Sequence, residues 1–144
     1  MSGCYEVAAT RSRANSSDTA IPRHPDDLAG HRIVTIDNGA LKSVDWRFAD
    51  GRITARVPSR FSVTMLDTAI DMALSGWALA RTLSYQVAPH VADGALQIVL
   101  RDFEPQPLPI HVVHQEGRRA SAKLRSFIDF AVGRLRATPA IQVG

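Results

Sequence analysis

The chain has 144 residues, a length that suits one domain with a buried core of its own. Hydrophobic residues make up 45% of it and charged residues 22%, which excludes a disordered or fibrous protein. The formal charge of +3 is mild, and the arginines are scattered without interleaved aromatic residues, so we expect no direct DNA contact by this chain. A solvated basic surface, or attraction for a small anion, accounts for the charge equally well.

The sequence predicts a cytoplasmic protein without membrane contact. No apolar run approaches the ~20 residues that a membrane-spanning helix needs. No apolar stretch typical of a secretion signal occurs in the first residues, MSGCYEVAATRSR. Cys4 is the single cysteine, so it has no partner for an internal disulfide.

The N-terminal part is predicted to be largely irregular. Residues 1–24 are rich in Ser, Thr, Asn and Arg and are expected to form a flexible lead-in, with one short strand at Tyr5–Ala9. Pro25–Leu28 carries acids where a helix N-terminus favours them, which predicts a single helical turn. Arg32–Asp37 is predicted to be a strand, and Asn38-Gly39 the turn after it.

Ser43–Val57 has the pattern of a β-hairpin. Asp50-Gly51 is a strong turn signal between two alternating segments, and Pro58 is expected to end the second strand. The apolar residues that alternate on the two strands are Val44, Trp46 and Phe48, then Ile53, Ala55 and Val57.

The next stretch predicts a central helix with one buried face. Its apolar residues recur at helical spacing: Leu66, Ala69, Ile70, Ala73 and Leu74. Ser62 or Thr64 is expected to cap its N-terminus, with Asp67 in the first turn, and Gly76 is expected to end it. The uncommitted N–H groups of such a helix start favour an anion.

A strand and a second helix are predicted to follow. Trp77–Ala80 is too short for a helix and suits a buried strand. Arg81–Ser84 is predicted to be a connecting loop, whose last serine caps a helix over Tyr85–Ala92. Pro89 lies inside that helix, so we expect the helix to be broken or kinked near Ala88.

The C-terminal part is predicted to alternate strand and helix. Leu96–Leu100 and Ile110–His114 are predicted strands, joined by an extended connector over Pro105–Pro109. Ser121 is expected to cap the last helix. The apolar stripe of that helix is Leu124, Phe127, Ile128, Ala131, Val132 and Leu135. Strands alternating with helices after a hairpin indicate an α/β layered domain.

No enzyme, metal or cofactor signature occurs in the sequence. His111 and His114 lie three apart on a predicted strand and therefore face opposite sides, which prevents joint chelation. The sequence contains no Gly-x-Ser-x-Gly elbow and no glycine-rich phosphate loop, and Cys4 lies in the predicted tail. We expect the aromatic residues to pack in the core or between lobes: Trp46, Phe48, Phe61, Phe127 and Phe130.

Four features, in this order and spacing, carry a family resemblance. A glycine-closed helix precedes a short strand, and a second helix ends in Ala92-Asp93-Gly94-Ala95-Leu96. A proline-rich turn precedes Pro109–Val113, and the chain closes with Leu124–Phe130. With these features, and back to Pro25–His31, the sequence resembles the second half of the effector-binding domain of LysR-type transcriptional regulators.

The resemblance implies a fold. It is a three-layer α/β lobe like that of type 2 periplasmic binding proteins, with a mixed sheet flanked by helices and an incomplete first lobe. Residues 25–116 would form the second lobe, and residues 117–144 a returning C-terminal helix and tail. The opening elements of the first lobe and the family's winged helix-turn-helix are not matched. The closing helix would normally pack on the first lobe, so its apolar stripe is expected to need another partner.

The resemblance also implies a ligand site. In the family, the effector lies in a cleft bordered by the start of the central helix and by the loop after the glycine-containing strand. The matching residues here are Ser62, Val63, Thr64, Arg81, Thr82 and Leu83. Simple helix capping explains the first group equally well, and a solvated arginine explains Arg81. The family's second glycine and its proline are replaced here by Ala78 and Ser84, and Trp77 adds bulk near the expected cleft.

The function implied is effector sensing by a homodimeric regulator whose DNA-binding domain lies outside the chain. The effector would be a small molecule, often an organic acid in this family. The alternative is a homodimerisation or interaction module that binds no small molecule.

Overall fold

The computed structural model describes residues 3–4, 6–11, 21–36, 43–58, 61–115 and 121–141. The chain divides into two compact units. The larger unit comprises Tyr5–Gln106, and the smaller one comprises Met1–Cys4 together with Pro107–Gly144.

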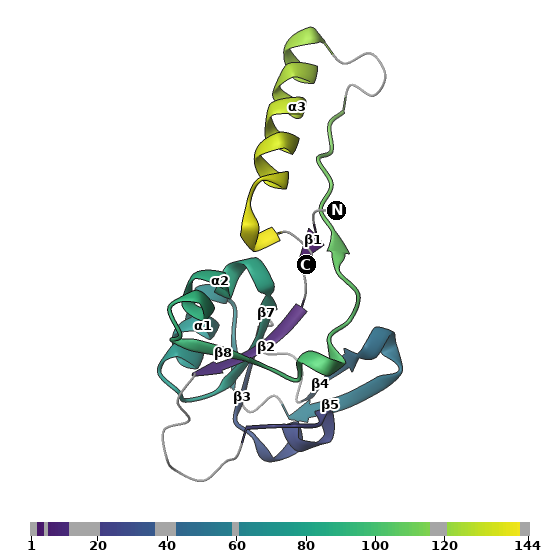
Figure 1. Cartoon of the computed structure of the whole chain (residues 1–144). Coiled ribbons are helices and arrows are strands. Elements are labelled where there is room, and N and C mark those ends of the chain that lie inside the picture. The colour runs from purple at the N-terminus through teal and green to yellow at the C-terminus, as the bar shows by residue number, and fades with distance from the viewer. Residues whose placement is uncertain are drawn as a thin grey trace. The chain divides into compact units, whose positions relative to one another are not determined.

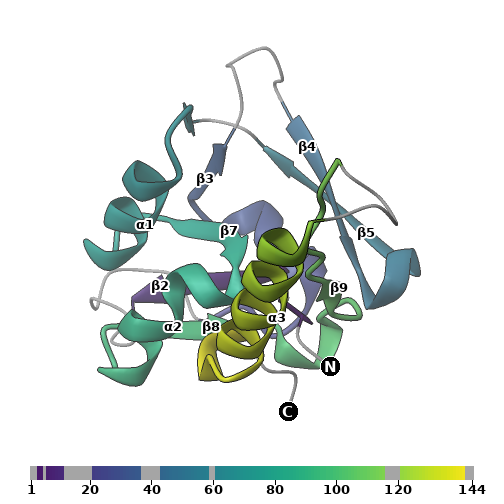
Figure 2. The same cartoon turned by 90° about the horizontal axis from the view of Figure 1, so that it is seen from above.

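A five-stranded mixed sheet forms the middle of the larger unit (Figure 2). Its strand order is β6-β3-β7-β2-β8. The strands are β2 (Glu6–Arg11), β3 (Ile33–Ile36), β6 (Phe61–Val63), β7 (Leu79–Leu83) and β8 (Leu96–Val99). Strand β3 pairs in parallel with β6 and β7, whereas β2 pairs antiparallel with β7 and β8. The strand predicted at Tyr5–Ala9 is therefore present as β2, in the interior of the sheet.

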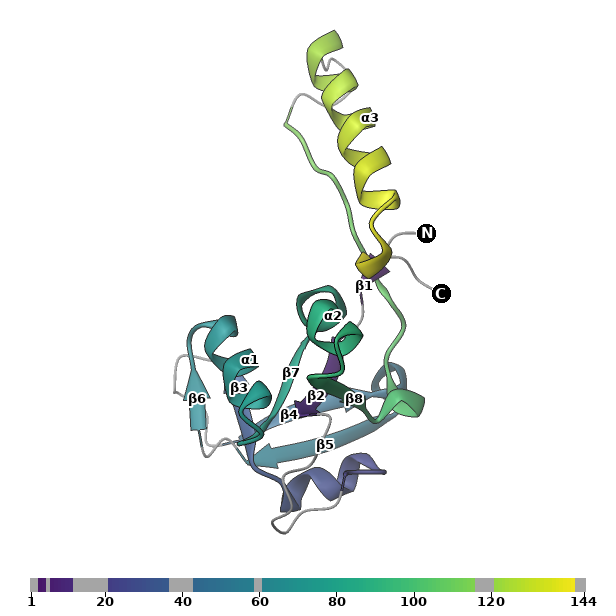
Figure 3. The same ribbon diagram turned by 60° about the vertical axis from the view of Figure 1, so that its left-hand side comes forward.

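Helices α1 (Leu66–Leu74) and α2 (Ser84–Ala92) cover one face of this sheet (Figure 3). The buried residues of this layer come from both helices and from alternate strand positions. They are Val34, Ala69, Ile70, Ala73, Ala78, Ala80, Val87 and Leu96. The small alanines on the strands let the helices pack closely on the sheet.

The hairpin of β4 (Ser43–Phe48) and β5 (Ile53–Pro58) covers the opposite face, together with the short helix η1 (Pro25–Gly30). The buried residues of this second layer are Leu28, Ile33, Trp46, Phe48, Ala55, Val57, Leu79, Val99 and Leu100. Hairpin, sheet and helices form three layers, as the resemblance implied, and the predicted hairpin is confirmed in register from Ser43↔Pro58 to Phe48↔Ile53.

The predicted side-chain cap of the central helix is wrong, whereas the acid in its first turn, Asp67, and its end at Gly76 are confirmed. Ser62 lies in β6 opposite Thr35 of β3, so it belongs to a strand and not to a helix cap. The residue before α1 is Met65, which makes no side-chain cap hydrogen bond. Gly76 does follow the end of the helix, with φ +76° in the left-handed region that favours glycine.

The predicted loop at Arg81–Ser84 is also wrong, because its first three residues belong to β7 and its last is the first residue of α2. The strand continues there because its backbone pairs with β2 as far as Leu83. Helix α2 runs through Pro89 without a break, contrary to the expectation of a break near Ala88. Proline removes a single N–H donor here, and the helix retains its packing through the buried Val87. The turn predicted at Asn38-Gly39 lies outside the described residues.

The smaller unit contains the two-residue strands β1 (Gly3–Cys4) and β9 (Leu108–Pro109), which pair antiparallel, and the helix α3 (Ala122–Arg136) (Figure 1). Ser121 caps α3 as predicted, since its hydroxyl accepts from the backbone N–H of Leu124 at 3.3 Å. The predicted strand at Ile110–His114 is wrong, because the chain is irregular there.

The aromatic residues differ in burial. Trp46 and Phe48 are buried between the hairpin and the sheet, as expected. Phe127 and Phe130 on α3 are 64% and 66% exposed, so they do not pack in a core of this chain, and their packing between lobes stays a prediction. Helix α3 has no fully buried residue, and Phe61 is also exposed.

Candidate functional site

A small cavity lies where the parallel strands β3 and β7 end and the helices α1 and α2 begin. Its volume is about 210 Å³. It is lined by Ile36, Leu66, Arg81, Thr82, Leu83 and Gln86. Ligands of open α/β sheets bind at the carboxyl ends of parallel strands, so this is the expected place for a binding site in such a fold.

Thr82 is a buried residue of the cavity wall. Its side chain is 5% exposed, and its Oγ1 has no hydrogen-bond partner within the described part of the chain. A buried hydroxyl without a partner costs roughly 1–3 kcal/mol, and such groups are rare in native proteins. A ligand that reached this hydroxyl as the cavity wall adjusted would remove the cost.

Gln86 adds an amide whose orientation is fixed. Its Oε1 accepts from the backbone N–H of Leu83 at 2.9 Å. This contact satisfies one of the free N–H groups at the start of α2, as the third helical residue does in a capping box. Leu83 has no side-chain acceptor, so only this half of the capping box forms.

Arg81 connects the cavity to the hairpin on the other face of the sheet. Its Nη2 donates to the backbone carbonyl of Arg47 at 2.8 Å. Its guanidinium carbon lies 5.5 Å from the ring centre of Trp46 and 5.2 Å from that of Phe48. These contacts are of the cation–π kind and hold β7 to the hairpin.

A second cavity, of about 360 Å³, adjoins the first and shares Ile36 and Arg81 with it. Its other lining residues are Val34, Thr35, Val44, Asp45, Trp46 and Arg47. Arg81 therefore borders two cavities, one near the helices and one along the edge of β4.

The structure brings together half of the predicted site residues. Arg81, Thr82 and Leu83 line the smaller cavity. Ser62, Val63 and Thr64 are not among its lining residues: Ser62 lies in β6, Val63 packs against the helix-side core, and Thr64 is exposed. The binding role of all six residues stays a prediction.

Sequence reasoning missed three residues of the cavity wall. Ile36 ends β3, Leu66 opens α1, and Gln86 is the third residue of α2. A glutamine three residues after the end of a strand is a signal for a helix start, and it would have identified Gln86.

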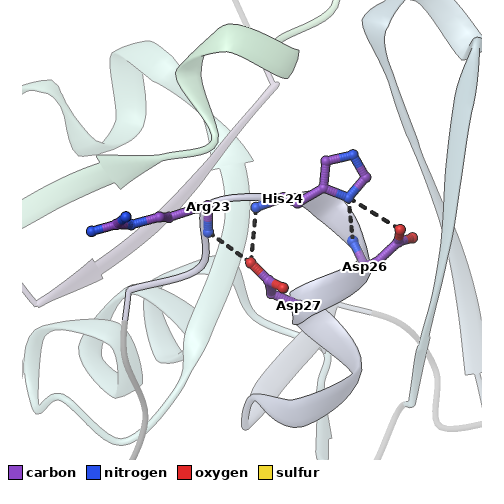
Figure 4. A network of polar contacts seen from close by, with 4 residues as sticks. All are labelled: Arg23, His24, Asp26 and Asp27. Atoms are coloured by element: carbon purple, nitrogen blue, oxygen red, sulfur yellow. Dashed lines mark hydrogen bonds and ion pairs between the residues drawn. The ribbon is translucent and has the colours of Figure 1, made fainter.

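None of the titratable groups with a shifted pKa in the described chain lines this cavity. Two backbone N–H groups, of His24 and Arg23, donate to Asp27 at 2.9 Å each and lower the pKa of its carboxyl (Figure 4). Burial raises the pKa of Glu104, although Arg101 partly offsets this. Burial lowers the pKa of His31, and Asp27 partly offsets that effect. The cavity is thus lined by neutral side chains and one arginine.

Neither a cluster of metal ligands nor a membrane-spanning helix occurs among the described residues. No three of their His, Cys, Asp and Glu side chains gather as metal ligands would. None of their helices combines the length and the hydropathy needed to cross a bilayer.

The architecture is that of a lobe of the type 2 periplasmic-binding-protein-like fold. Residues 9–136 match the family model described as the LysR substrate binding domain. The chain therefore belongs to the LysR substrate-binding-domain family, as the resemblance indicated. This family consists of transcriptional regulators.

Relatives and solved structures agree with this assignment. The chain is 29% identical over 119 residues to an HTH-type transcriptional regulator of Xanthomonas campestris pv. campestris, covering 79% of this chain and 35% of that protein. It is 26% identical over 110 residues to a putative transcriptional regulator of Pseudomonas aeruginosa, covering 74% and 36%. The chain thus spans about a third of the length of these relatives.

Two solved regulatory domains share the fold. The regulatory domain of CrgA, a LysR-type regulator from Neisseria meningitidis, superposes with a TM-score of 0.71 at 20% identity, over 92% of this chain and 65% of that one. The regulatory domain of AphB in Vibrio vulnificus gives 0.66 at 18% identity, over 93% and 66%.

Proposed function

We propose that this chain is the effector-sensing part of a LysR-type regulator and that it binds a small organic acid in the cavity of about 210 Å³. DNA contact would belong to a domain outside the chain. The observation that carries the proposal is the Thr82 hydroxyl, which is buried without a partner in the described structure and belongs to a residue of the cavity wall. An unpaired buried hydroxyl destabilises the free protein, and such groups are found mostly at functional sites, where a ligand can supply the missing hydrogen bond.

The position of the cavity explains how binding would be sensed. Its wall is formed by the end of β7 and the first turns of α1 and α2, three elements that also build the helix-side core. A ligand that contacts all three favours the arrangement in which they lie together. Any difference in affinity between two arrangements of the domain then shifts their populations by that same free energy.

The test is a thermal-shift and calorimetric screen of small organic acids. We expect at least one acid to stabilise the protein, and Thr82→Val to weaken its binding by about tenfold, the value of one hydrogen bond. Ser62→Ala and Thr64→Ala are matched controls from the predicted site that lie off the cavity wall. A screen in which no acid binds, or in which Thr82→Val binds as tightly as the wild type, contradicts the proposal.

A second candidate function is homodimerisation through the smaller unit without a ligand, and the exposed residues of α3 favour it. Phe127 and Phe130 project as large apolar side chains that this unit leaves exposed. The same unit carries a groove of about 340 Å³. The groove is lined by Pro109, Ile110, His111, Val112, Ile128, Val132, Leu135 and Arg136. A two-fold dimer brings the same patch of both copies together, so the phenylalanines of one copy would fill the groove of the other.

Sedimentation at micromolar concentrations tests this candidate. We expect a dimer for the wild type and a monomer for the double variant Phe127→Glu, Phe130→Glu, which changes exposed positions and should leave the fold intact. A wild-type monomer rules out dimerisation through this face. A dimer that persists in the variant places the interface elsewhere.

A further inference from the structure

We infer that Gln86 is a specificity-determining residue which, with Thr82, selects the effector by an acceptor oxygen and not by its negative charge. This inference rests on the proposed function, because it concerns the ligand of the same cavity. Gln86 was not among the predicted site residues. Arg81, which was expected to contact the effector, is instead engaged with the hairpin.

The first step is the orientation of the Gln86 amide. Its Oε1 accepts from the backbone N–H of Leu83. In the flipped amide orientation the NH2 group would face this N–H, and two donors cannot form a hydrogen bond. The oxygen is therefore committed to the backbone, and the Nε2 hydrogens are the groups left for other partners. No partner for Nε2 is found within the described chain, and Gln86 lines the cavity. Gln86 thus offers donors only.

The second step is that Thr82 belongs to the same cavity wall as Gln86. Thr82 is the fourth residue of β7, and Gln86 is four positions later, in the first turn of α2. Both lie on the wall of one cavity of about 210 Å³. The hydroxyl rotates freely between donating and accepting, so it adapts to whatever group Gln86 has selected. A carbonyl or carboxylate oxygen satisfies both donors, whereas an ammonium group would face the Nε2 hydrogens and be rejected.

The third step is that the guanidinium of Arg81 already has partners in the hairpin. The guanidinium of Arg81 lies over the rings of Trp46 and Phe48 and donates to the Arg47 carbonyl. A carboxylate in the cavity would have to compete with these contacts for the charge. The remaining wall residues, Ile36, Leu66 and Leu83, are apolar and suit a short hydrocarbon body.

The neutral character of these donors has a measurable consequence. Hydrogen bonds to an arginine strongly favour a charged carboxylate over an uncharged carbonyl. Donors from an amide and a hydroxyl discriminate far less. We therefore expect an acid and the methyl ketone of the same shape to bind with affinities within about fivefold, and the matching primary amine not to bind.

The experiment uses calorimetric titration with three matched probe sets based on propionate, butyrate and benzoate. Each set contains the acid, its methyl ketone and its primary amine. The decisive variant is Gln86→Glu, which keeps an acceptor for the Leu83 N–H and replaces the Nε2 donors by a second acceptor oxygen. We expect it to keep the wild-type melting temperature or exceed it, and to lose acid and ketone binding by more than about tenfold.

Arg81→Met is the comparison variant, and we expect it to change acid affinity less than Gln86→Glu does. Failure of the inference is distinguishable from failure of the proposed function. Absence of binding by every probe to the wild type overturns both. Binding of acids with rejection of the ketones, an unchanged affinity in Gln86→Glu, or a larger loss in Arg81→Met overturns the inference alone.

Discussion

Replacement of Thr82 by valine should stabilise the free protein, although it removes a polar group. Valine has the same β-branched shape and suits a strand equally well. The hydroxyl that it removes is buried and has no partner in the described structure, a situation that costs roughly 1–3 kcal/mol. We expect Thr82→Val to raise the free energy of unfolding by about 1 kcal/mol, the lower end of that range.

Thr35 provides a matched control in the same sheet. It is the other buried polar residue of the described chain, at 4% exposure, but its hydroxyl donates to the Phe61 carbonyl at 3.4 Å. Thr35→Val removes a hydrogen bond that is made, so it should lower the free energy of unfolding by about 1 kcal/mol. The two substitutions are chemically identical and are expected to have opposite signs.

Urea denaturation followed by intrinsic fluorescence measures both effects. Trp46 and Trp77 both belong to the larger unit, so the signal reports the unit that contains the substitutions. A change of 1 kcal/mol moves the midpoint by roughly 0.3–1 M urea. If Thr82→Val destabilises the protein as much as Thr35→Val does, the hydroxyl has a partner in solution, and the main support for a ligand site is lost.

Three further predictions concern the rest of the larger unit. Asp27→Asn should reduce the loss of stability on acidification. The folded-state pKa of the Asp27 carboxyl is lowered, so its contribution to the free energy of unfolding is present above its unfolded pKa and is lost as pH falls through the folded pKa. Urea midpoints measured between about pH 7 and pH 3 will show the difference. Gly76→Ala should lower the free energy of unfolding by about 1 kcal/mol, because alanine is strained at φ +76°. A urea midpoint equal to that of the wild type would contradict this backbone conformation. Arg81→Met should lower the free energy of unfolding by about 1–2 kcal/mol. In a Trp77→Phe background it should also shift the fluorescence emission of Trp46. Unchanged emission would mean that the guanidinium does not lie over the Trp46 ring.

The features that the sequence predicts well depend on neighbours along the chain. The hairpin follows from alternation around Asp50-Gly51, the end of α1 from Gly76, and the start of α3 from Ser121. Each of these signals acts within a few residues, so a single sequence contains all of it.

The features that it misses depend on partners far along the chain. Ser62 reads as a helix cap until β6 is seen to pair with β3, and Arg81 reads as a loop residue until β7 is seen between β3 and β2. Conversely, Ile110–His114 has a strand-like composition but no described strand beside it. Pairing with a strand far along the chain leaves no local signal, and this accounts for both errors: Ser62 in β6 pairs with β3, and Arg81, Thr82 and Leu83 in β7 pair with β2.

The candidate site was predicted in part for the same reason. The resemblance pointed to Arg81, Thr82 and Leu83, which do line the cavity. Leu66 and Gln86 reach it from two helices whose meeting point depends on packing against the sheet. No spacing in the sequence connects these two residues.

The register of β7 separates two tasks that adjacent residues perform. Ile33 pairs with Leu79 and Val34 with Ala80, which places Leu79 in the hairpin-side core and Ala80 in the helix-side core. By alternation, Arg81 faces the hairpin and Thr82 faces the helices. A slip of one residue would exchange the two side chains between the hairpin side and the helix side of the sheet.

This arrangement makes a last prediction, on the coupling between the two residues. Arg81 and Thr82 are neighbours in sequence and both line the smaller cavity. The Arg81 guanidinium contacts the Arg47 carbonyl and the Trp46 ring, whereas the Thr82 hydroxyl has no hydrogen-bond partner in the described structure. In a double-mutant cycle of unfolding free energies, Arg81→Met and Thr82→Val should therefore be additive within about 0.5 kcal/mol. Coupling of about 1 kcal/mol or more would show that the cavity and the hairpin communicate through the strand, and Arg81 would then have to be counted among the effector-sensing residues.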